Sequence, residues 1–208
     1  MTVFAGVGKD GSLWGPLLEK AFAKLHGNYE ALARGDPRNA IQYLTGGPSE
    51  LYWHTDKSAA EIFDLVKQAT LEDGMISAGT PLSPIGNRAR TELGLAKSHI
   101  YTVLSAHEVT DRYGRLRKLY RVRNPWGRES YTGAFRDKDT FNWDATLRAK
   151  VAYVDDNDGT FFIDADTYHD EIWYTKINID TENMKQSFYL VQDDNSADGK
   201  HEFTVKAT

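Results

Sequence analysis

The first amphipathic stretch of the chain runs from Trp14 to Leu25, where apolar residues recur every three or four positions. This spacing places them on one face of an α-helix, and Pro16 is tolerated in a first helical turn. Gly27 follows, and glycine readily adopts the left-handed conformation that ends helices. We therefore expect a helix over 14–25 whose apolar stripe packs on another surface. The simplest expectation for four of the tryptophans is a place in the core: Trp14, Trp53, Trp143 and Trp173.

A second helix is predicted to begin after Ser58. Ser58 and Glu61 form the Ser-x-x-Glu pattern of a capping box, and helically spaced apolar residues continue to Leu71 before Gly74. Residues 33–49, between the two helices, lose this periodicity and gather glycine and proline. That composition is typical of a loop or linker.

The strongest strand pattern is a hairpin within residues 95–127. Apolar and polar residues alternate after Ile100 and again from Leu116 to Val122, and the run Asp111–Gly114 between them is a turn signal. Antiparallel pairing would bring His99, before the first strand, to the same end of the sheet as Asn124, after the second. Further strands are expected at 75–79, 160–163, 172–179, 187–191 and 202–205, with an irregular loop at 81–93 and a helical turn at 164–169.

Composition narrows the class of protein. With 208 residues and 40 % hydrophobic content the chain can form a packed core, and its net charge of −5 argues against a nucleic-acid partner. No run has the length of a membrane span or the features of a signal peptide, so the cytoplasm is the default compartment. There is no cysteine, which excludes disulfides, thiolate zinc sites and a cysteine nucleophile within this chain. The histidines lack the spacing of a zinc site, and nothing indicates an organic cofactor.

The predicted proximity of His99 and Asn124 has a chemical meaning. A carboxamide oxygen that accepts a hydrogen bond from the N–H of one imidazole nitrogen fixes the tautomer and leaves the other nitrogen to face a nucleophile. We expect Nδ1 to donate to Asn124 and Nε2 to face the nucleophile. Pro125 restricts the backbone after Asn124, and Trp126 is large enough to shield the pair from water.

Four stretches of the sequence resemble the calpain family of papain-like cysteine proteases. Lys97-Ser-His-Ile-Tyr-Thr-Val103 and Arg123-Asn-Pro-Trp-Gly127 are similar to the family's Lys-Gly-His-Ala-Tyr-Ser-Val and Arg-Asn-Pro-Trp-Gly motifs. Leu13–Leu32 is similar to the helix that closes the first core subdomain, and Tyr43–Gly47 to the junction between the core subdomains. The resemblance implies an α+β fold, the second lobe of a papain-like cysteine protease, with an antiparallel β-sheet or barrel-like core and flanking helices.

The same resemblance implies three parts of the chain. Residues 1–46 would be the closing helix and linker of the first core subdomain, 47–181 the second core subdomain, and 182–208 a C-terminal tail or the start of a further β domain. In such an enzyme His99 would be the base, Asn124 would orient it, and Trp126 would cover the pair or block the cleft. A cysteine from the upstream first core subdomain would then cleave protein substrates. The alternative is a catalytically inactive calpain-like module that binds proteins or peptides.

Calcium is the one cofactor that the resemblance brings in. An EF-hand is not present at 155–159 because the loop lacks its terminal bidentate Glu. The resemblance instead places Asp137 and Asp158 at acidic ligand positions and Asp156 where a backbone carbonyl binds. Ser130 and Thr160 stand where better-studied members have glutamates, so we expect a weakened or absent calcium site. Thr160 also removes a carboxylate that pairs with an Arg of the first subdomain. Ser98 replaces the Gly before the His, and its Cβ is expected to crowd the substrate path.

Overall fold

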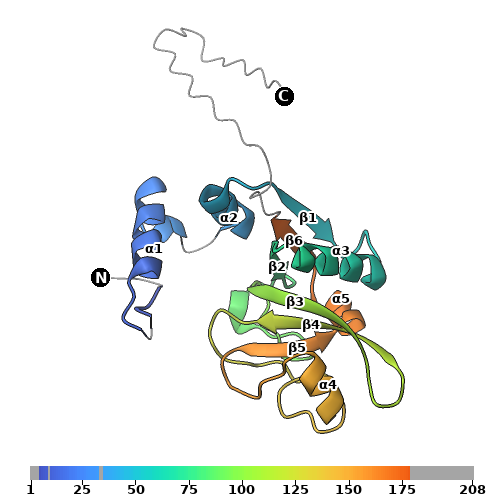
Figure 1. Cartoon of the computed structure of the whole chain (residues 1–208). Coiled ribbons are helices and arrows are strands. Elements are labelled where there is room, and N and C mark those ends of the chain that lie inside the picture. The colour runs from blue at the N-terminus through green and yellow to red at the C-terminus, as the bar shows by residue number, and fades with distance from the viewer. Residues whose placement is uncertain (1–4, 9, 33–34, 179–208) are drawn as a thin grey trace.

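The computed structural model of the chain describes residues 5–8, 10–32 and 35–178 (Figure 1). The strands predicted at 187–191 and 202–205, and the proposed segment 182–208, lie outside the described residues. Among the described helices, none combines the length and the apolar character that crossing a membrane would require.

Helices and strands are interspersed along the described part of the chain. The helices are α1 (Trp14–Leu25), α2 (Pro37–Thr45), α3 (Ala59–Leu71), α4 (Ala145–Lys150) and α5 (Ala165–Glu171), with 3₁₀ turns η1 (Glu30–Leu32) and η2 (Gly86–Arg88). The strands are β1 (Ser49–Trp53), β2 (Met75–Gly79), β3 (Ile100–Thr110), β4 (Leu116–Arg123), β5 (Thr160–Asp164) and β6 (Tyr174–Asn178).

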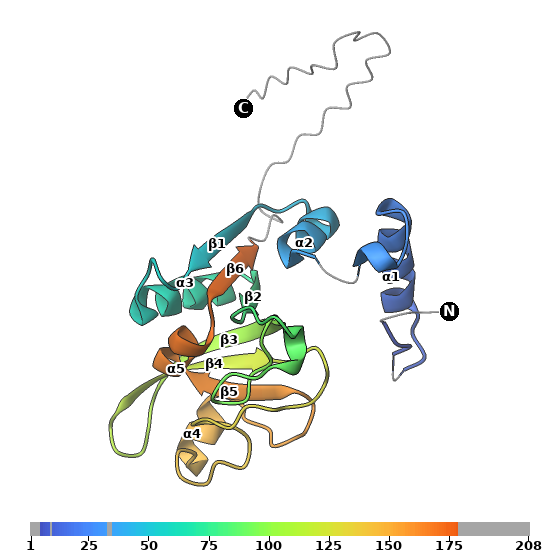
Figure 2. The same ribbon diagram turned by 180° about the vertical axis from the view of Figure 1, so that it is seen from behind.

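The six strands form one sheet in the order β1-β6-β2-β3-β4-β5, and every neighbouring pair is antiparallel. Strands β3 and β4 are joined by the predicted turn. Figures 1 and 2 show β3, β4 and β5 side by side in one half of the sheet, with α1 set apart from it. The predicted α+β class, with an antiparallel sheet and flanking helices, is confirmed.

The core lies on both faces of the sheet, because side chains alternate between the two faces along each strand. On β5, Phe161 and Ile163 belong to the larger cluster, with Ile62 and Tyr168 of α3 and α5. Phe162, which points the other way, belongs to a second cluster that α4 covers. Members of this second cluster include Leu119, Phe135, Trp143, Leu147 and Val151.

The predicted helix over 14–25 is confirmed, but its apolar stripe is largely exposed among the described residues. Trp14 is 70 % exposed, and Leu17 and Leu25 are exposed as well. Trp143, at 5 %, is the one member of the four named tryptophans that is buried in the core. The expectation of a core position is therefore wrong for three of them. No described element covers the face of α1 that carries Trp14, and Trp53 and Trp173 are 42 % and 44 % exposed.

Residues 33–49 are not simply a loop, as their composition indicated, because α2 lies inside this range. The Asp36 side chain accepts a hydrogen bond from the Arg38 N–H and caps the helix, Pro37 stands in the first turn, and Gly46 ends it with φ of 71°. These are ordinary helix signals. They were missed because the same Pro and Gly also count as loop signals. Strand β1 and helix α4 were likewise not predicted.

An ion pair ties α2 to the sheet. Lys176 of β6 is only 5 % exposed, and its ammonium nitrogen lies 2.6 Å from Asp36 Oδ1. Burial would raise the pKa of the Asp36 carboxyl, but hydrogen bonds from Arg38 and Lys176 overcome this effect and hold the pKa well below its usual value. Helix α2 is thus fastened to the subdomain that follows it, although it precedes the predicted boundary at residue 46.

The Asp36–Lys176 pair gives a sharp stability prediction. Asp36→Asn keeps a residue that caps helices but leaves the buried ammonium without its charged partner, and we expect a loss of about 3 kcal/mol or more in the free energy of unfolding. Arg38→Gln removes the more exposed partner and should cost about 1 kcal/mol or less. Urea titration of the two variants checks the difference. Equal losses of unfolding free energy would show that the buried Lys176 ammonium does not need the charge of Asp36.

Candidate active site

His99 is positioned by the end of strand β2. Its backbone N–H donates to Thr80 Oγ1 at 3.1 Å, and its carbonyl accepts from the Thr80 N–H at 3.1 Å. Thr80 Oγ1 also donates to the Ala96 carbonyl at 2.7 Å. One buried threonine therefore holds both sides of the loop that ends at His99, and no sequence motif predicts this role.

Asn124 is held at the end of β4. Its side chain is buried, its N–H donates to the Gly159 carbonyl at 2.8 Å, and its carbonyl accepts from the Gly127 N–H at 3.0 Å. The β3–β4 pairing ends at Thr102 and Arg123. His99 and Asn124 consequently emerge at the same end of the sheet, and the distance from His99 Nε2 to Asn124 Oδ1 is 3.0 Å.

The structure corrects the predicted assignment of the two ring nitrogens of His99. Nε2, not Nδ1, meets the carboxamide oxygen of Asn124. An oxygen acceptor at this position requires the proton on Nε2, which leaves Nδ1 as the free lone pair of the neutral ring. Which nitrogen turns toward Asn124 depends on how the ring is packed, and the sequence does not contain that information.

Two aromatic rings enclose the imidazole. The Trp126 ring lies with its centroid 4.2 Å from that of His99 at an interplanar angle of 37°, and Tyr101 meets His99 edge-on at 5.0 Å. The backbone N–H of Trp126 also donates to Asn124 Oδ1 at 3.1 Å, so the carboxamide oxygen binds both residues. Trp126 thus covers the His99–Asn124 hydrogen bond.

The environment of His99 favours a neutral imidazole. Burial lowers the pKa of His99 most, the bond to Asn124 opposes this effect, and the positive charge of Arg90 lowers the pKa further. A neutral ring with a free Nδ1 can accept a proton. The Nδ2 of Asn124 is buried and has no hydrogen-bond partner among the described residues.

A cleft of about 900 Å³ opens beside His99. It is lined by Ser98, His99 and Pro125, by residues 82–88 of the loop that precedes them, and by Tyr174. Ser98 lines this cleft as expected, with a φ of 48°. However, its Oγ accepts a hydrogen bond from the Ser83 N–H at 2.8 Å, so the hydroxyl is engaged with the loop.

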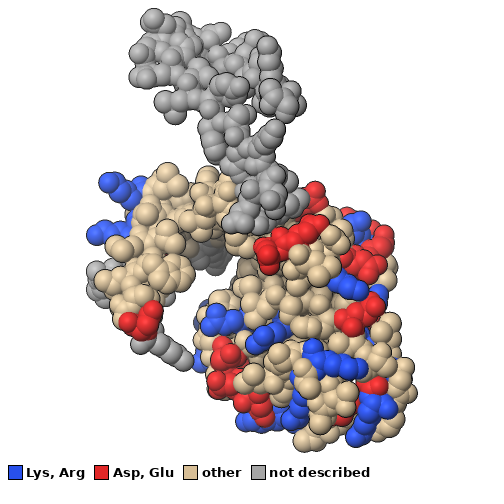
Figure 3. Space-filling view, in the orientation of Figure 1, with Lys and Arg blue, Asp and Glu red and all other residues tan. Residues whose placement is uncertain are grey.

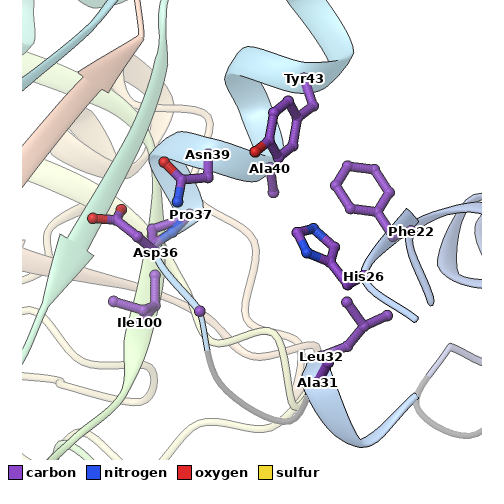
Figure 4. Close-up of a pocket in the computed structure, with 11 residues that line it drawn as sticks. Phe22, His26, Ala31, Leu32, Asp36, Pro37, Asn39, Ala40, Tyr43 and Ile100 are labelled. Carbon is purple, nitrogen blue, oxygen red and sulfur yellow. The ribbon is translucent and has the colours of Figure 1, made fainter. Parts of the chain in front are cut away.

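A second, smaller cavity of about 290 Å³ lies between α1 and α2. Figure 4 shows Phe22, His26 and Tyr43 pointing toward one another there, and the ring centroids of Phe22 and Tyr43 are 6.2 Å apart. The Asp36 carboxylate points out of this cavity toward the sheet. The lining is mainly aromatic and aliphatic, without the paired polar groups found beside His99.

The residues predicted to bind calcium lie in two loops beside the sheet. Asp137 is buried and its Oδ1 has no hydrogen-bond partner, while its N–H lies 3.4 Å from Glu129 Oε1. Burial, with the charges of Asp155 and Asp158, raises the pKa of Asp137 to about 6. Burial and the charge of Asp137 raise the pKa of Glu129 to about 7. Glu129 was not predicted, although it directly precedes Ser130.

The other two predicted ligands are engaged within their own loop. The Asp158 carboxylate accepts from the Thr160 N–H at 2.7 Å, and the Asp156 carbonyl accepts from the Asp158 N–H at 2.9 Å. Among the described residues, no three His, Cys, Asp or Glu side chains come together as a group that could hold a metal ion. Calcium binding by these loops therefore stays a prediction.

The close approach of Gly159 to Asn124 generates a prediction. Gly159 has φ of 87°, and a Cβ added there would lie 2.7 Å from the Asn124 carbonyl oxygen. Gly114, at the tip of the β3–β4 turn, has φ of 77° with nothing within 4 Å of such a Cβ. Gly159→Ala should therefore cost more than the roughly 1–2 kcal/mol of backbone strain that Gly114→Ala shares.

Thermal unfolding of the two variants measures this difference, and an NMR spectrum of the His99 ring reports whether the bond to Asn124 has moved. We expect the His99 signals to shift in Gly159→Ala and to stay in place in Gly114→Ala. Equal destabilisation with unchanged His99 signals would show that the contact with Asn124 carries no strain.

Comparison with known proteins identifies the family of the chain. A model of calpain family cysteine proteases matches residues 1–180. Calpain-12 of Homo sapiens is 37 % identical over 153 residues, which are 73 % of this chain and 21 % of that protein. The calpain-2 catalytic subunit of Gallus gallus is 35 % identical over 142 residues, 68 % of this chain and 20 % of that protein. Calpain-9 of Mus musculus is 33 % identical over 165 residues, 77 % of this chain and 24 % of that protein. The chain thus spans about a fifth to a quarter of the length of these relatives, and it belongs to the calpain family of cysteine proteases.

Proposed function

We propose that this chain supplies the His/Asn half of the active site of a calpain-like cysteine endopeptidase. The observation that carries the proposal is the 3.0 Å contact of His99 Nε2 with Asn124 Oδ1 beneath Trp126, which leaves Nδ1 available. The chain contains no cysteine, so the nucleophile must come from the upstream first core subdomain. Protein substrates and a cytoplasmic location remain part of the prediction.

The proposed chemistry transfers one proton through His99. The cysteine thiol would give its proton to Nδ1, and the thiolate sulfur would add to the carbonyl carbon of the scissile peptide bond. As the C–N bond breaks, Nδ1 would return the proton to the leaving amine. Water would then give a proton to Nδ1 while its oxygen adds to the acyl carbon, and release of the acid would restore the thiolate.

Asn124 and Trp126 support this proton transfer in different ways. Asn124 Oδ1 accepts a hydrogen bond from Nε2–H throughout, which holds the ring orientation and stabilises the imidazolium once it forms. Trp126 limits the access of water to that hydrogen bond, and a hydrogen bond is electrostatically stronger where water is excluded.

The exposed face of α1 supports the proposal that an upstream subdomain packs against this chain. Trp14, Leu17 and Leu25 form an apolar surface that the described residues leave open. The view in Figure 3 shows acidic and basic side chains interspersed over the sheet subdomain, whereas the side formed by α1 and α2 is mostly uncharged. An exposed apolar helix face is suited to packing against the subdomain that would carry the cysteine.

The alternative, an inactive module that binds proteins or peptides, drew on Ser98, Ser130 and Thr160. The hydrogen bond from the Ser83 N–H to Ser98 Oγ weakens the first of these arguments, because it gives the hydroxyl a place in the wall of the cleft. The other two concern calcium and, for Thr160, the pairing with an Arg of the first subdomain, and they leave the His99–Asn124 pair intact.

Reconstitution tests the proposed function. We expect that mixing this chain with a calpain first subdomain that carries the cysteine restores casein cleavage, and that His99→Ala lowers the rate by about 10³-fold or more. His107→Ala is the matched control, because His107 lies on β3 and bonds to Ser105 away from the pair. Full activity of His99→Ala would refute the assignment of the base. Absence of cleavage with retained binding of a casein peptide would favour the inactive module.

We further propose that calcium binds this chain weakly. Calorimetric titration should show no saturation below about 1 mM, because no three acidic side chains of the described residues form a group that could hold a metal ion, and one predicted ligand, Asp158, is held by Thr160. Saturable binding at lower concentration that Asp137→Asn removes would contradict this expectation. Glu129→Gln then separates the roles of the two neighbouring carboxylates.

A further inference from the structure

The ring of Trp126 contacts two cationic side chains in addition to the neutral ring of His99. The guanidinium carbon of Arg90 lies 5.6 Å from the ring centroid, and that of Arg128 lies 5.8 Å from it. Guanidinium groups at this distance are attracted to the electron-rich face of an indole. We propose that Arg90 is a positioning residue that holds Trp126 over His99, an inference that rests on the proposed role of His99 as the base.

Arg90 is itself fixed in place. Its backbone forms a β-bridge with Ala96, and its Nη1 donates to the carbonyls of Asn87 at 2.7 Å and Ala89 at 3.0 Å. The Ala96 N–H donates to the hydroxyl of Tyr101, the residue whose ring meets His99 edge-on. The guanidinium therefore belongs to the same hydrogen-bonded loop that leads to His99.

The position of Arg90 also gives its charge a direct effect on the base. Of the groups around the imidazole, Asn124, Tyr101 and Trp126 are neutral, and Arg90 is the cation that lowers the pKa of His99 in addition to burial. A cation close to a neutral imidazole disfavours the imidazolium until an anion forms beside it. Arg90 thus favours a neutral His99 in the absence of the thiolate and holds the Trp126 ring over His99.

Arg128 provides the matched control. It contacts the same indole ring at nearly the same distance, but it comes from the turn after β4 and not from the loop that leads to His99. If any cation on Trp126 sufficed, the two arginines would be equivalent. If the loop-bound guanidinium matters, only the replacement of Arg90 will change the properties of His99.

NMR titration of the His99 ring protons in the cysteine-free chain tests the inference without any cleavage assay. In the wild type these protons should be shifted upfield by the Trp126 ring, and Trp126→Ala identifies that contribution. We expect Arg90→Gln to raise the pKa of His99 and to reduce the upfield shift. Arg90→Lys, which keeps the charge but not the planar group, should hold the pKa low while the upfield shift falls.

The controls separate this inference from the proposed function. Arg128→Gln should leave both readouts at their wild-type values. Unchanged His99 signals in a folded Arg90→Gln variant, or an equal rise in pKa for Arg128→Gln, would overturn the role of Arg90. Both results are read from this chain alone, so a failed reconstitution with the cysteine subdomain would reject the proposed function and leave the Arg90 measurement standing.

Discussion

The candidate site depends on the antiparallel pairing of β3 with β4. Only this direction of pairing brings the residue before one strand next to the residue after the other, and so places His99 3.0 Å from Asn124. Strand β5 then pairs with β4 and brings the Gly159 carbonyl onto the Asn124 N–H. A sheet built for packing therefore also sets the distance between a base and the group that orients it.

Enclosure gives that pair its chemical character. Trp126 and Tyr101 surround the imidazole, and the resulting burial lowers the pKa of His99 more than any other cause. Burial alone would make a poor base, because it penalises the imidazolium that must form. The hydrogen bond from Nε2 to Asn124 opposes the penalty, so the neutral ring can still accept a proton at Nδ1.

The carboxylates of the two acidic loops differ from one another in their surroundings. Glu129 and Asp137 lie together. Burial and the charge of Asp137 raise the pKa of Glu129, whereas burial and the charges of Asp155 and Asp158 raise the pKa of Asp137. Such a pair is relieved by a proton or by a cation. Asp158, in contrast, has its pKa lowered by hydrogen bonds from Thr160 and by the charges of Arg123 and Arg121. The loops thus divide into a protonatable pair and an aspartate that is already stabilised within the protein.

The sequence by itself determined the local elements and the identity of the chemical groups. The helical period of 14–25, the capping box at Ser58, the β3–β4 hairpin and the pairing of His99 with Asn124 all follow from short-range patterns, and each is present. Helix α2 was not predicted because its capping residues, Asp36 and Gly46, are residue types that are also common in loops. Only the tertiary structure decided which nitrogen of His99 meets Asn124, because the orientation of a ring depends on the side chains packed around it. The same reason holds for Glu129 and Arg90, since their partners are set by how loops fold against each other and not by their spacing in the chain.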